Sequence, residues 1–130
     1  MPKITFVSLV VGLSILLAAC GGNSTPVVDN NSVNINVTFE TRPSPMMMGN
    51  GEVILTITDS NGNPIEGAVV DISMEHTGHN MGTMQGTATE QGNGRYAINA
   101  GFSMSGTWKL TVNVKKDDLN YTEEIEIPVQ

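Results

Sequence analysis

Apolar and polar residues alternate along most of the chain from Val33 onwards. Successive side chains of a strand point to opposite faces of its sheet, so this period of two predicts strands with one buried face. The predicted inward sets, each made of every second residue, are Val33–Phe39, Val53–Ile57, Ala68–Met74, Tyr96–Ala100, Trp108–Val114 and Tyr121–Val129. No segment shows the helical period of 3.6 residues, so the pattern predicts an all-β protein.

Short segments rich in Gly, Asn, Asp and Pro separate the predicted strands. Asp59–Pro64 predicts a turn, because its glycine permits a positive φ and its proline fixes φ on exit. Gln91–Gly94 is typical of a β-hairpin, and Lys116–Asn120 turns the chain again. About seven short strands at regular spacing indicate an immunoglobulin-like antiparallel β-sandwich, with Trp108 as its main core aromatic.

The N-terminal segment has a different character. Lys3 precedes the apolar run Ile4–Ala19, which has the order of a secretory signal and is too short and too interrupted for a membrane-spanning helix. The run ends in Leu17–Gly21, which resembles a bacterial lipobox, the motif in which a cysteine, here Cys20, receives a lipid anchor. An ordinary signal peptide with a chance cysteine is the alternative.

This motif divides the chain into three parts. We expect a cleaved lipoprotein signal peptide at residues 1–19, the lipidated Cys20 with a flexible linker at residues 20–32, and the sandwich domain at residues 33–130. This layout predicts a lipid-anchored protein of the bacterial cell envelope, outside the cytoplasm. It does not indicate which membrane holds the anchor.

Charge and cysteine content narrow the choice of partner and of stabilising chemistry. The chain has 13 Asp and Glu against 6 Lys and Arg, a formal net charge of -7. An acidic surface repels phosphate backbones, which argues against a nucleic-acid partner. Cys20 is the sole cysteine, so no intramolecular disulfide can form and the apolar core alone must hold the domain.

Two segments break the alternation and hold most of the sulfur and imidazole groups. Arg42–Asn50 contains Met46, Met47 and Met48 among prolines and a glycine, which indicates a loop. Met74–Met84 contains both histidines of the chain. With one methionine from further along the chain, the candidate ligands of this segment are Met74, His76, His79, Met81, Met84 and Met104, and Met46, Met47 and Met48 of the first segment are further candidates. Thioether sulfur favours Cu(I) and imidazole adds to such a site, so the composition predicts copper binding.

The alternation suggests how this second segment is arranged. It places Met74 and His76 on the same side of a strand, and two glycines let the following loop fold back to bring His79 and Met81 near them. His76, His79 and Met81 are therefore the strongest candidates, whereas packing in the core is the alternative for Met74 and Met104.

Zinc is the competing metal, and the spacing of the ligands argues against it. His-x-x-His without cysteine is weak zinc spacing. Only Asp71 and Glu75 could complete a set of four ligands from this segment.

The stretch from Val37 to Val114 resembles the YtkA-like domain, a small extracytoplasmic module of bacterial envelope proteins. The residues that carry the resemblance are Gly49-Asn50 before Val53-Ile54-Leu55, the turn Asp59–Pro64 before Gly67-Ala68-Val69-Val70, the loop Met74–Met84, Gly94-Arg95-Tyr96, and Phe102–Trp108, similar to the family pattern aromatic-x-Met-x-Gly-x-Trp. The resemblance implies a β-sandwich linked to copper handling, with Met74, His76, His79, Met81, Met84 and Met104 as copper contacts.

The residues described above bear on three classes of function. The favoured one is a Cu(I)-binding lipoprotein that buffers copper or delivers it to an envelope acceptor or transporter. The alternative is a non-enzymatic adaptor module without metal, whose methionine loops form a protein contact surface. An enzyme is not expected, because Ser73 lies near Glu75 and His76 without a strained nucleophile turn or a third orienting group.

Overall fold

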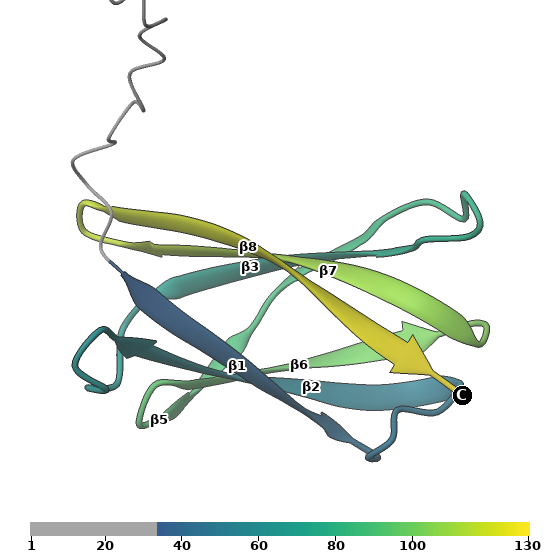
Figure 1. The fold of residues 1–130 in the computed structure, drawn as a ribbon, viewed down its shortest axis with the longest axis horizontal. Helices are drawn as coiled ribbons and strands as arrows, with labels where there is room; N and C mark the ends of the chain where they lie inside the picture. The colour runs from purple at the N-terminus through teal and green to yellow at the C-terminus, as the bar shows by residue number, and fades with distance from the viewer. Residues whose placement is uncertain (1–33) are drawn as a thin grey trace, which may run out of the picture.

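The alternating segments form eight β-strands in the computed structural model, which describes residues 34–130 (Figure 1). The strands are β1 (Ile35–Arg42), β2 (Gly49–Asp59), β3 (Val69–His76), β4 (Met84–Thr87), β5 (Thr89–Gly92), β6 (Arg95–Phe102), β7 (Gly106–Lys116) and β8 (Leu119–Val129). Within these residues, no helix is long and apolar enough to cross a membrane. The expected signal peptide, Cys20 and linker lie outside the described residues.

The strands form two antiparallel sheets that pack face to face. Sheet A has the order β1-β2-β6-β5 and sheet B has the order β4-β3-β7-β8. The predicted antiparallel β-sandwich is therefore confirmed. About seven strands were predicted and the structure has eight; the alternation did not show β4 and β5, which are short and follow one another closely. The chain leaves sheet B after β4, passes the buried Ala88 and joins sheet A as β5.

The inward sets fill the space between the sheets. The side chains that are fully buried and large are Tyr96, Phe102, Met46, Leu55, Ile57, Ile72, Leu110, Ile127, Val53, Val70, Val112 and Val114. Trp108 is not the main core aromatic by itself, because Tyr96 and Phe102 are equally buried. Every core residue lies between Ile35 and Val129, so a chain that starts at Gly21 contains the whole core and is expected to fold as a unit.

One inward prediction is wrong. Phe39 faces Leu55 across the β1–β2 pair, yet its side chain is 39% exposed. β1 is an edge strand that pairs only with β2, and along it the burial decreases from Ile35 through the half-buried Val37 to Phe39. Val33, the first member of this predicted set, lies outside the described residues.

The predicted turn at Asp59–Pro64 connects β2 to the other sheet. The Asp59 carboxylate accepts hydrogen bonds from the side-chain amide of Asn63 at 3.0 Å and from the backbone N–H groups of Asn63 at 2.9 Å and Asn61 at 2.8 Å. Gly62 has a φ of +84°, as a turn glycine often does. The bonds to Asn63, the side-chain one above all, lower the pKa of Asp59 below its ordinary value of 3.8.

A buried tyrosine fixes the chain where it crosses from sheet A to sheet B. The Tyr96 hydroxyl donates a hydrogen bond to the carbonyl of Ile65 at 2.7 Å and accepts one from the N–H of Ala68 at 3.1 Å. Burial raises the pKa of Tyr96 above 10.0. The hydroxyl therefore satisfies two backbone groups of the connection between β2 and β3, the carbonyl of Ile65 and the N–H of Ala68.

Candidate metal centre

The strand register brings three connections to one end of the sandwich. These connections are residues 43–48 between β1 and β2, residues 77–83 between β3 and β4, and residues 103–105 between β6 and β7. The first residue of β2 lies opposite the last residue of β6, and the last residue of β3 lies opposite the start of β7. We call this end, on the right of Figure 1 beside the C-terminus, the methionine end.

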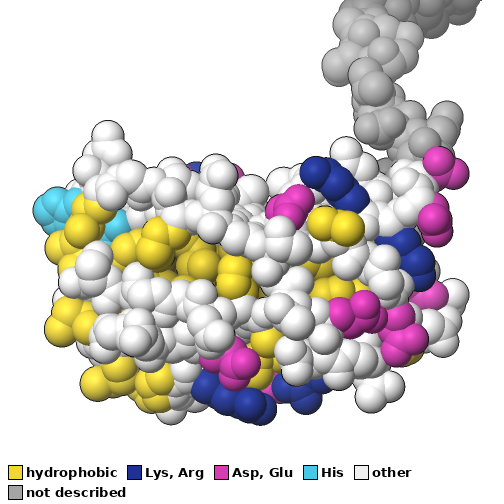
Figure 2. Space-filling model, turned by 180° about the vertical axis from the view of Figure 1, so that it is seen from behind, with side chains coloured by type: hydrophobic (Ala, Val, Ile, Leu, Met, Phe, Trp, Pro, Cys, Tyr) yellow, Lys and Arg dark blue, Asp and Glu magenta, His cyan; other side chains and the backbone are white. Residues whose placement is uncertain are grey.

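The methionine end carries little charge on the face that Figure 2 shows. The histidine side chains lie at this end beside hydrophobic side chains that reach the surface, whereas the Lys, Arg, Asp and Glu side chains of that face lie further along the molecule (Figure 2).

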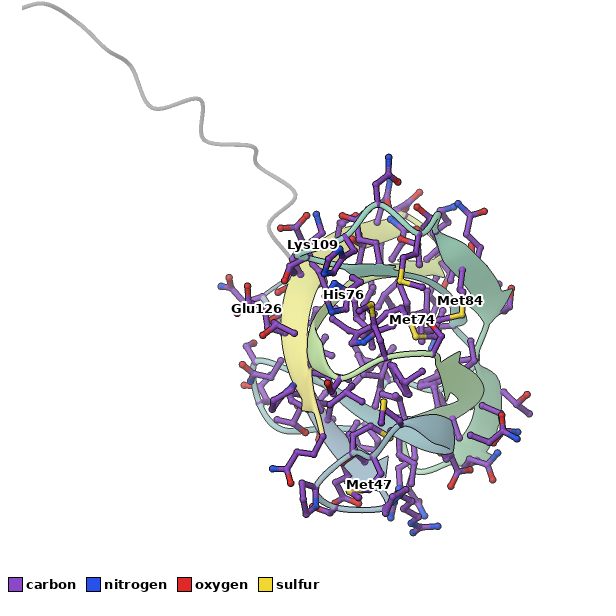
Figure 3. The ribbon with its side chains drawn as sticks, turned by 90° about the vertical axis from the view of Figure 1, so that its right-hand side faces the viewer. Met47, Met74, His76, Met84, Lys109 and Glu126 are labelled. Carbon is purple, nitrogen blue, oxygen red and sulfur yellow. The ribbon has the colours of Figure 1, made fainter. Side chains whose placement is uncertain are left out.

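Two methionines on neighbouring strands face one another close to His76. Met74 of β3 is the direct cross-strand partner of Met84 of β4. Directly opposite residues have side chains on the same face, so both thioethers point toward the space between the sheets. Met74 is 2% exposed and Met84 is half-buried against the core. His76, two residues after Met74, lies on the same face at the end of the strand (Figure 3).

Both ring nitrogens of His76 have hydrogen-bond partners. Nε2 lies 3.1 Å from the carbonyl oxygen of Ser105, and Nδ1 accepts hydrogen bonds from the N–H groups of Gly78 at 3.0 Å and His79 at 3.1 Å. A carbonyl oxygen can only accept, so Nε2 must carry the proton and the lone pair must lie on Nδ1. The hydrogen-bond network thus assigns one neutral tautomer to this ring.

The β6–β7 connection forms one wall around His76. The indole of Trp108 meets the imidazole edge to face with ring centroids 5.4 Å apart. A Cβ on Gly106 would lie 2.5 Å from Nε2, so only glycine fits there. Trp108 Nε1 donates a hydrogen bond at 3.1 Å to the carbonyl of Met104, whose side chain is half-buried against the core. Met104 is therefore held on the same side of the sandwich as His76.

The β3–β4 connection folds back as its glycines predict. The rings of His79 and His76 have centroids 5.4 Å apart and a tilt of 39°. A surface hollow of about 420 Å³ is lined by both histidines, by Met81 and other residues of this connection, and by the charged Glu75 of β3 and Lys109 of β7. Met81 is 52% exposed and His79 is exposed. The structure therefore brings His76, His79 and Met81 to one hollow.

The β1–β2 methionines are separate from this group. Met46 is 1% exposed, and its sulfur occupies the space that a Cβ on Gly51 would take. Its backbone lies beside the end of β8, where the N–H of Gln130 donates to its carbonyl at 2.9 Å. Met47 and Met48 are 48% and 57% exposed. Figure 3 looks onto the methionine end and shows Met47 far from Met74, His76 and Met84, so the end contains two groups of methionines.

One of the two carboxylates near the histidines shares their hollow: Glu75 lines it together with Lys109, whereas Asp71 does not. Asp71 and Glu75 lie on the outer face of β3, opposite to the face of Met74 and His76. Lys109 Nζ lies 2.6 Å from Glu75, and that hydrogen bond raises the pKa of Lys109 above 10.5. Asp71 accepts a hydrogen bond from Thr87 at 2.7 Å. Among residues 34–130, no three His, Cys, Asp or Glu side chains form a group that could hold a metal ion.

The donors at the methionine end fit a soft ion. They are imidazole nitrogens and thioether sulfurs, which are uncharged and suit Cu(I). The two rings lie close enough for one nitrogen of each to bind the same ion, since metal–imidazole bonds are about 2 Å long. A ring N–H held by a backbone carbonyl, as in His76, is also the usual outer partner of a metal-binding histidine.

Sequence reasoning missed the residues that hold His76. Phe102, Met104, Gly106 and Trp108 alternate, and the structure gives each a part: Phe102 packs edge to face on Trp108 at 5.3 Å, Met104 accepts from the indole, and Gly106 leaves room for the imidazole. The signal was present as the aromatic-x-Met-x-Gly-x-Trp pattern. Its glycine was not linked to His76, because the two lie on different strands.

The fold and this site define a class of protein: a small antiparallel β-sandwich with histidine and methionine side chains on the connections at one end. The chain belongs to the YtkA-like family, whose profile matches residues 29–113, more than half of the chain. No curated protein gives a significant match.

Two solved structures have a similar fold. The adhesin InvE of Yersinia pseudotuberculosis superposes with a TM-score of 0.54 and 27% identity over 76% of this chain, which spans 28% of the length of the adhesin. The soluble domain of PmoD from a Methylocystis species superposes with a TM-score of 0.50 and 11% identity, covering 74% of this chain and 90% of that domain. Both are similar to the sandwich described above.

Proposed function

We propose that this protein binds Cu(I) at the methionine end and buffers it or passes it to an acceptor. His76, His79 and Met81 are the proposed ligands, and the thioethers of Met74, Met84 and Met104 line the inner side of the site. The observation that carries the proposal is the approach of the two imidazoles, 5.4 Å apart, beside a hollow that Met81 also lines.

The choice of Cu(I) rests on the donor chemistry. Thioethers are soft, neutral ligands that favour Cu(I) over harder divalent ions. Of the nearby carboxylates, which zinc would need, Glu75 lines the hollow but is paired with Lys109 at 2.6 Å, and Asp71 accepts a hydrogen bond from Thr87. The YtkA-like resemblance, with its link to copper handling, supports the same choice.

The exposure of the ligands supports exchange rather than permanent storage. His79 is exposed and Met81 is 52% exposed, so an acceptor protein can reach both side chains from solvent. Met74, by contrast, is only 2% exposed. A site whose outer ligands are accessible is suited to handing an ion to a partner.

A competition titration tests the proposal. Cu(I) is titrated under reducing conditions into the chain from Gly21 to Gln130 against a chromogenic chelator. We expect affinity tighter than micromolar, and a loss of at least about 100-fold when His76, His79 and Met81 are replaced together. The matched control replaces Met47 and Met48 with serine and should change the affinity less than about threefold. Binding weaker than micromolar, or an unaffected triple variant, contradicts the proposal.

We also propose that Cys20 carries a lipid that holds the domain at the outer side of a bacterial membrane. The support is the lipobox-like Leu17–Gly21 at the end of the apolar N-terminal run. Labelled palmitate fed to cells should enter the wild-type chain and not the Cys20→Ser variant. Equal labelling of both chains argues against the anchor.

A second function, a metal-free adaptor, is favoured by one observation. Met47 and Met48 follow one another in the β1–β2 connection and are both exposed, and Figure 3 shows Met47 away from His76. Exposed methionines suit adaptable protein contacts. If this function holds, an envelope partner is recovered in the presence of a copper chelator, and replacing both methionines with serine abolishes recovery while leaving Cu(I) affinity unchanged.

A further inference from the structure

The lone pair of His76 already accepts hydrogen bonds from the backbone in this fold. Nε2 donates its proton to the carbonyl of Ser105, so a neutral ring has only the Nδ1 lone pair to offer. That lone pair accepts the N–H groups of Gly78 and His79, at 3.0 and 3.1 Å. The same electron pair therefore closes the first turn of the β3–β4 connection.

The other nitrogen is enclosed by backbone. A Cβ on Gly106 would lie 2.5 Å from Nε2, so the glycine backbone passes directly beside that atom. Trp108 stands edge to face against the same ring at 5.4 Å. The ring is thus held with Nε2 toward the β6–β7 connection and with Nδ1 toward residues 77–83.

We propose that His76 binds its metal ion through Nδ1, and that in doing so it releases the amides of Gly78 and His79, so that metal binding opens the β3–β4 connection. This inference rests on the function proposed above. An Nδ1 lone pair directed at an ion cannot also accept two N–H groups, so the closed turn and the occupied ligand exclude one another. The Ser105 carbonyl and Gly106 act as positioning groups, because they keep the proton on Nε2.

The hydrogen bonds beside His76 locate the hinge. Thr77 donates to the carbonyl of Thr107 from both its N–H and its hydroxyl, each at 3.0 Å, and neither bond involves the imidazole. The chain up to Thr77 therefore stays on the sheet, and movement begins at Gly78. Gly82, with a φ of +84°, gives the far end of the connection similar freedom. Opening frees the side chains of His79 and Met81 to turn toward the ion.

Amide hydrogen exchange measured by NMR on the chain from Gly21 to Gln130 tests this inference. Ag(I) serves as a redox-stable substitute for Cu(I), and quenching of the single Trp108 reports its binding in the same sample. We expect Gly78 and His79 to be protected without metal and to exchange at least about tenfold faster with Ag(I) bound, while Thr77 is unchanged. Ring ¹⁵N spectra should show silver at Nδ1 and the proton still on Nε2.

Variants reproduce the opening without metal. His76→Phe keeps a ring against Trp108 and removes the acceptor, so Gly78 and His79 should exchange fast in the metal-free variant. His79→Phe is the matched control and should keep both amides protected. Loss of Thr77 protection in either variant would signal general unfolding of that variant. In that case, the exchange rates of the wild-type chain with and without Ag(I) test the inference.

The outcomes separate the two proposals. If Ag(I) binds and Gly78 and His79 stay protected, or if silver is found on Nε2, this inference is wrong while the metal site stands. If Ag(I) and Cu(I) do not bind at all, the proposed function fails and this inference fails with it.

Discussion

Neighbouring methionines of this chain have different roles, which burial separates. Met46 is 1% exposed and packs with its sulfur against Gly51, whereas Met48 is 57% exposed. A buried thioether contributes through packing, and an exposed one is free to meet a partner. Counting methionines therefore overstates the metal site: of the three in Met46–Met48, one belongs to the core.

Replacing these methionines tests that division. Met46→Ala should lower the free energy of unfolding by about 2–5 kcal/mol, because it leaves a cavity in the core. Met48→Ala, the control in the same loop, should change it by less than about 0.5 kcal/mol. Urea denaturation followed by Trp108 fluorescence measures both. Equal effects would mean that Met46 is not part of the core.

Tyr96 is the second residue with a clear energetic role. Tyr96→Phe removes the hydroxyl that pairs with the carbonyl of Ile65 and the N–H of Ala68, so we expect a loss of about 1–3 kcal/mol of stability. Tyr121→Phe is the control, because the half-buried Tyr121 bonds only the side chain of Glu123. Its effect should stay within about 0.5 kcal/mol. Thermal or urea denaturation that ranks the two variants in the opposite order contradicts this role.

At the scale of elements, the turns are as informative as the strands. The turn at Asp59–Pro64 is stabilised by one carboxylate that accepts three hydrogen bonds, two of them from Asn63. These bonds lower the pKa of Asp59 on folding. As the pH falls, Asp59 is protonated in the unfolded chain before it is protonated in the folded chain. The stabilisation is therefore present above pH 3.8 and is lost as the pH falls through the lowered pKa of the folded state.

The pH dependence of an Asp59→Asn variant tests this contribution. We expect the variant to be less stable than the wild type at neutral pH, and the difference to shrink as the pH falls below 3.8. Asp118→Asn makes the same charge change at an exposed position of the β7–β8 turn and serves as the control. Melting temperatures of the variant and the wild type, measured from neutral pH to below pH 3.8, test this expectation. A difference in melting temperature that does not vary with pH argues against the proposed role of the carboxylate.

Much of the element structure could be predicted from the sequence. Period-two alternation located the long strands, because their inward faces are buried by the opposite sheet. It missed the short β4 and β5, since a strand of four residues is too short to show a clear alternation of apolar and polar residues. It also misplaced Phe39, because alternation gives the face of a residue and not how far the other sheet covers it.

The candidate site was predicted less completely. The strands and glycines correctly indicated that His76, His79 and Met81 lie together. The tautomer of His76 could not be predicted, because it depends on the carbonyl of Ser105, twenty-nine residues away in sequence. Such contacts follow from strand register across the sheet, which a single sequence does not specify.

At the scale of the whole molecule, the soft ligands share their hollow with the Glu75–Lys109 ion pair, and other charged side chains lie further along the sandwich. On the face of Figure 2 the charged side chains lie away from the end that holds the histidines. The chain carries a net charge of -7, so the overall field attracts cations, while the neutral donors at the methionine end select among them. The sandwich supplies a rigid frame, and three connections at one end supply the chemistry.

X-ray absorption of the Cu(I)-loaded chain from Gly21 to Gln130 tests the central claim most directly. We expect one copper ion per chain in the Cu(I) state, with nitrogen neighbours at about 2.0 Å and at least one sulfur neighbour at about 2.3 Å. The sulfur shell should weaken when Met81 is replaced and persist when Met47 and Met48 are replaced. A first shell made only of nitrogen and oxygen, or a sulfur shell that depends on Met47 and Met48, would contradict the account.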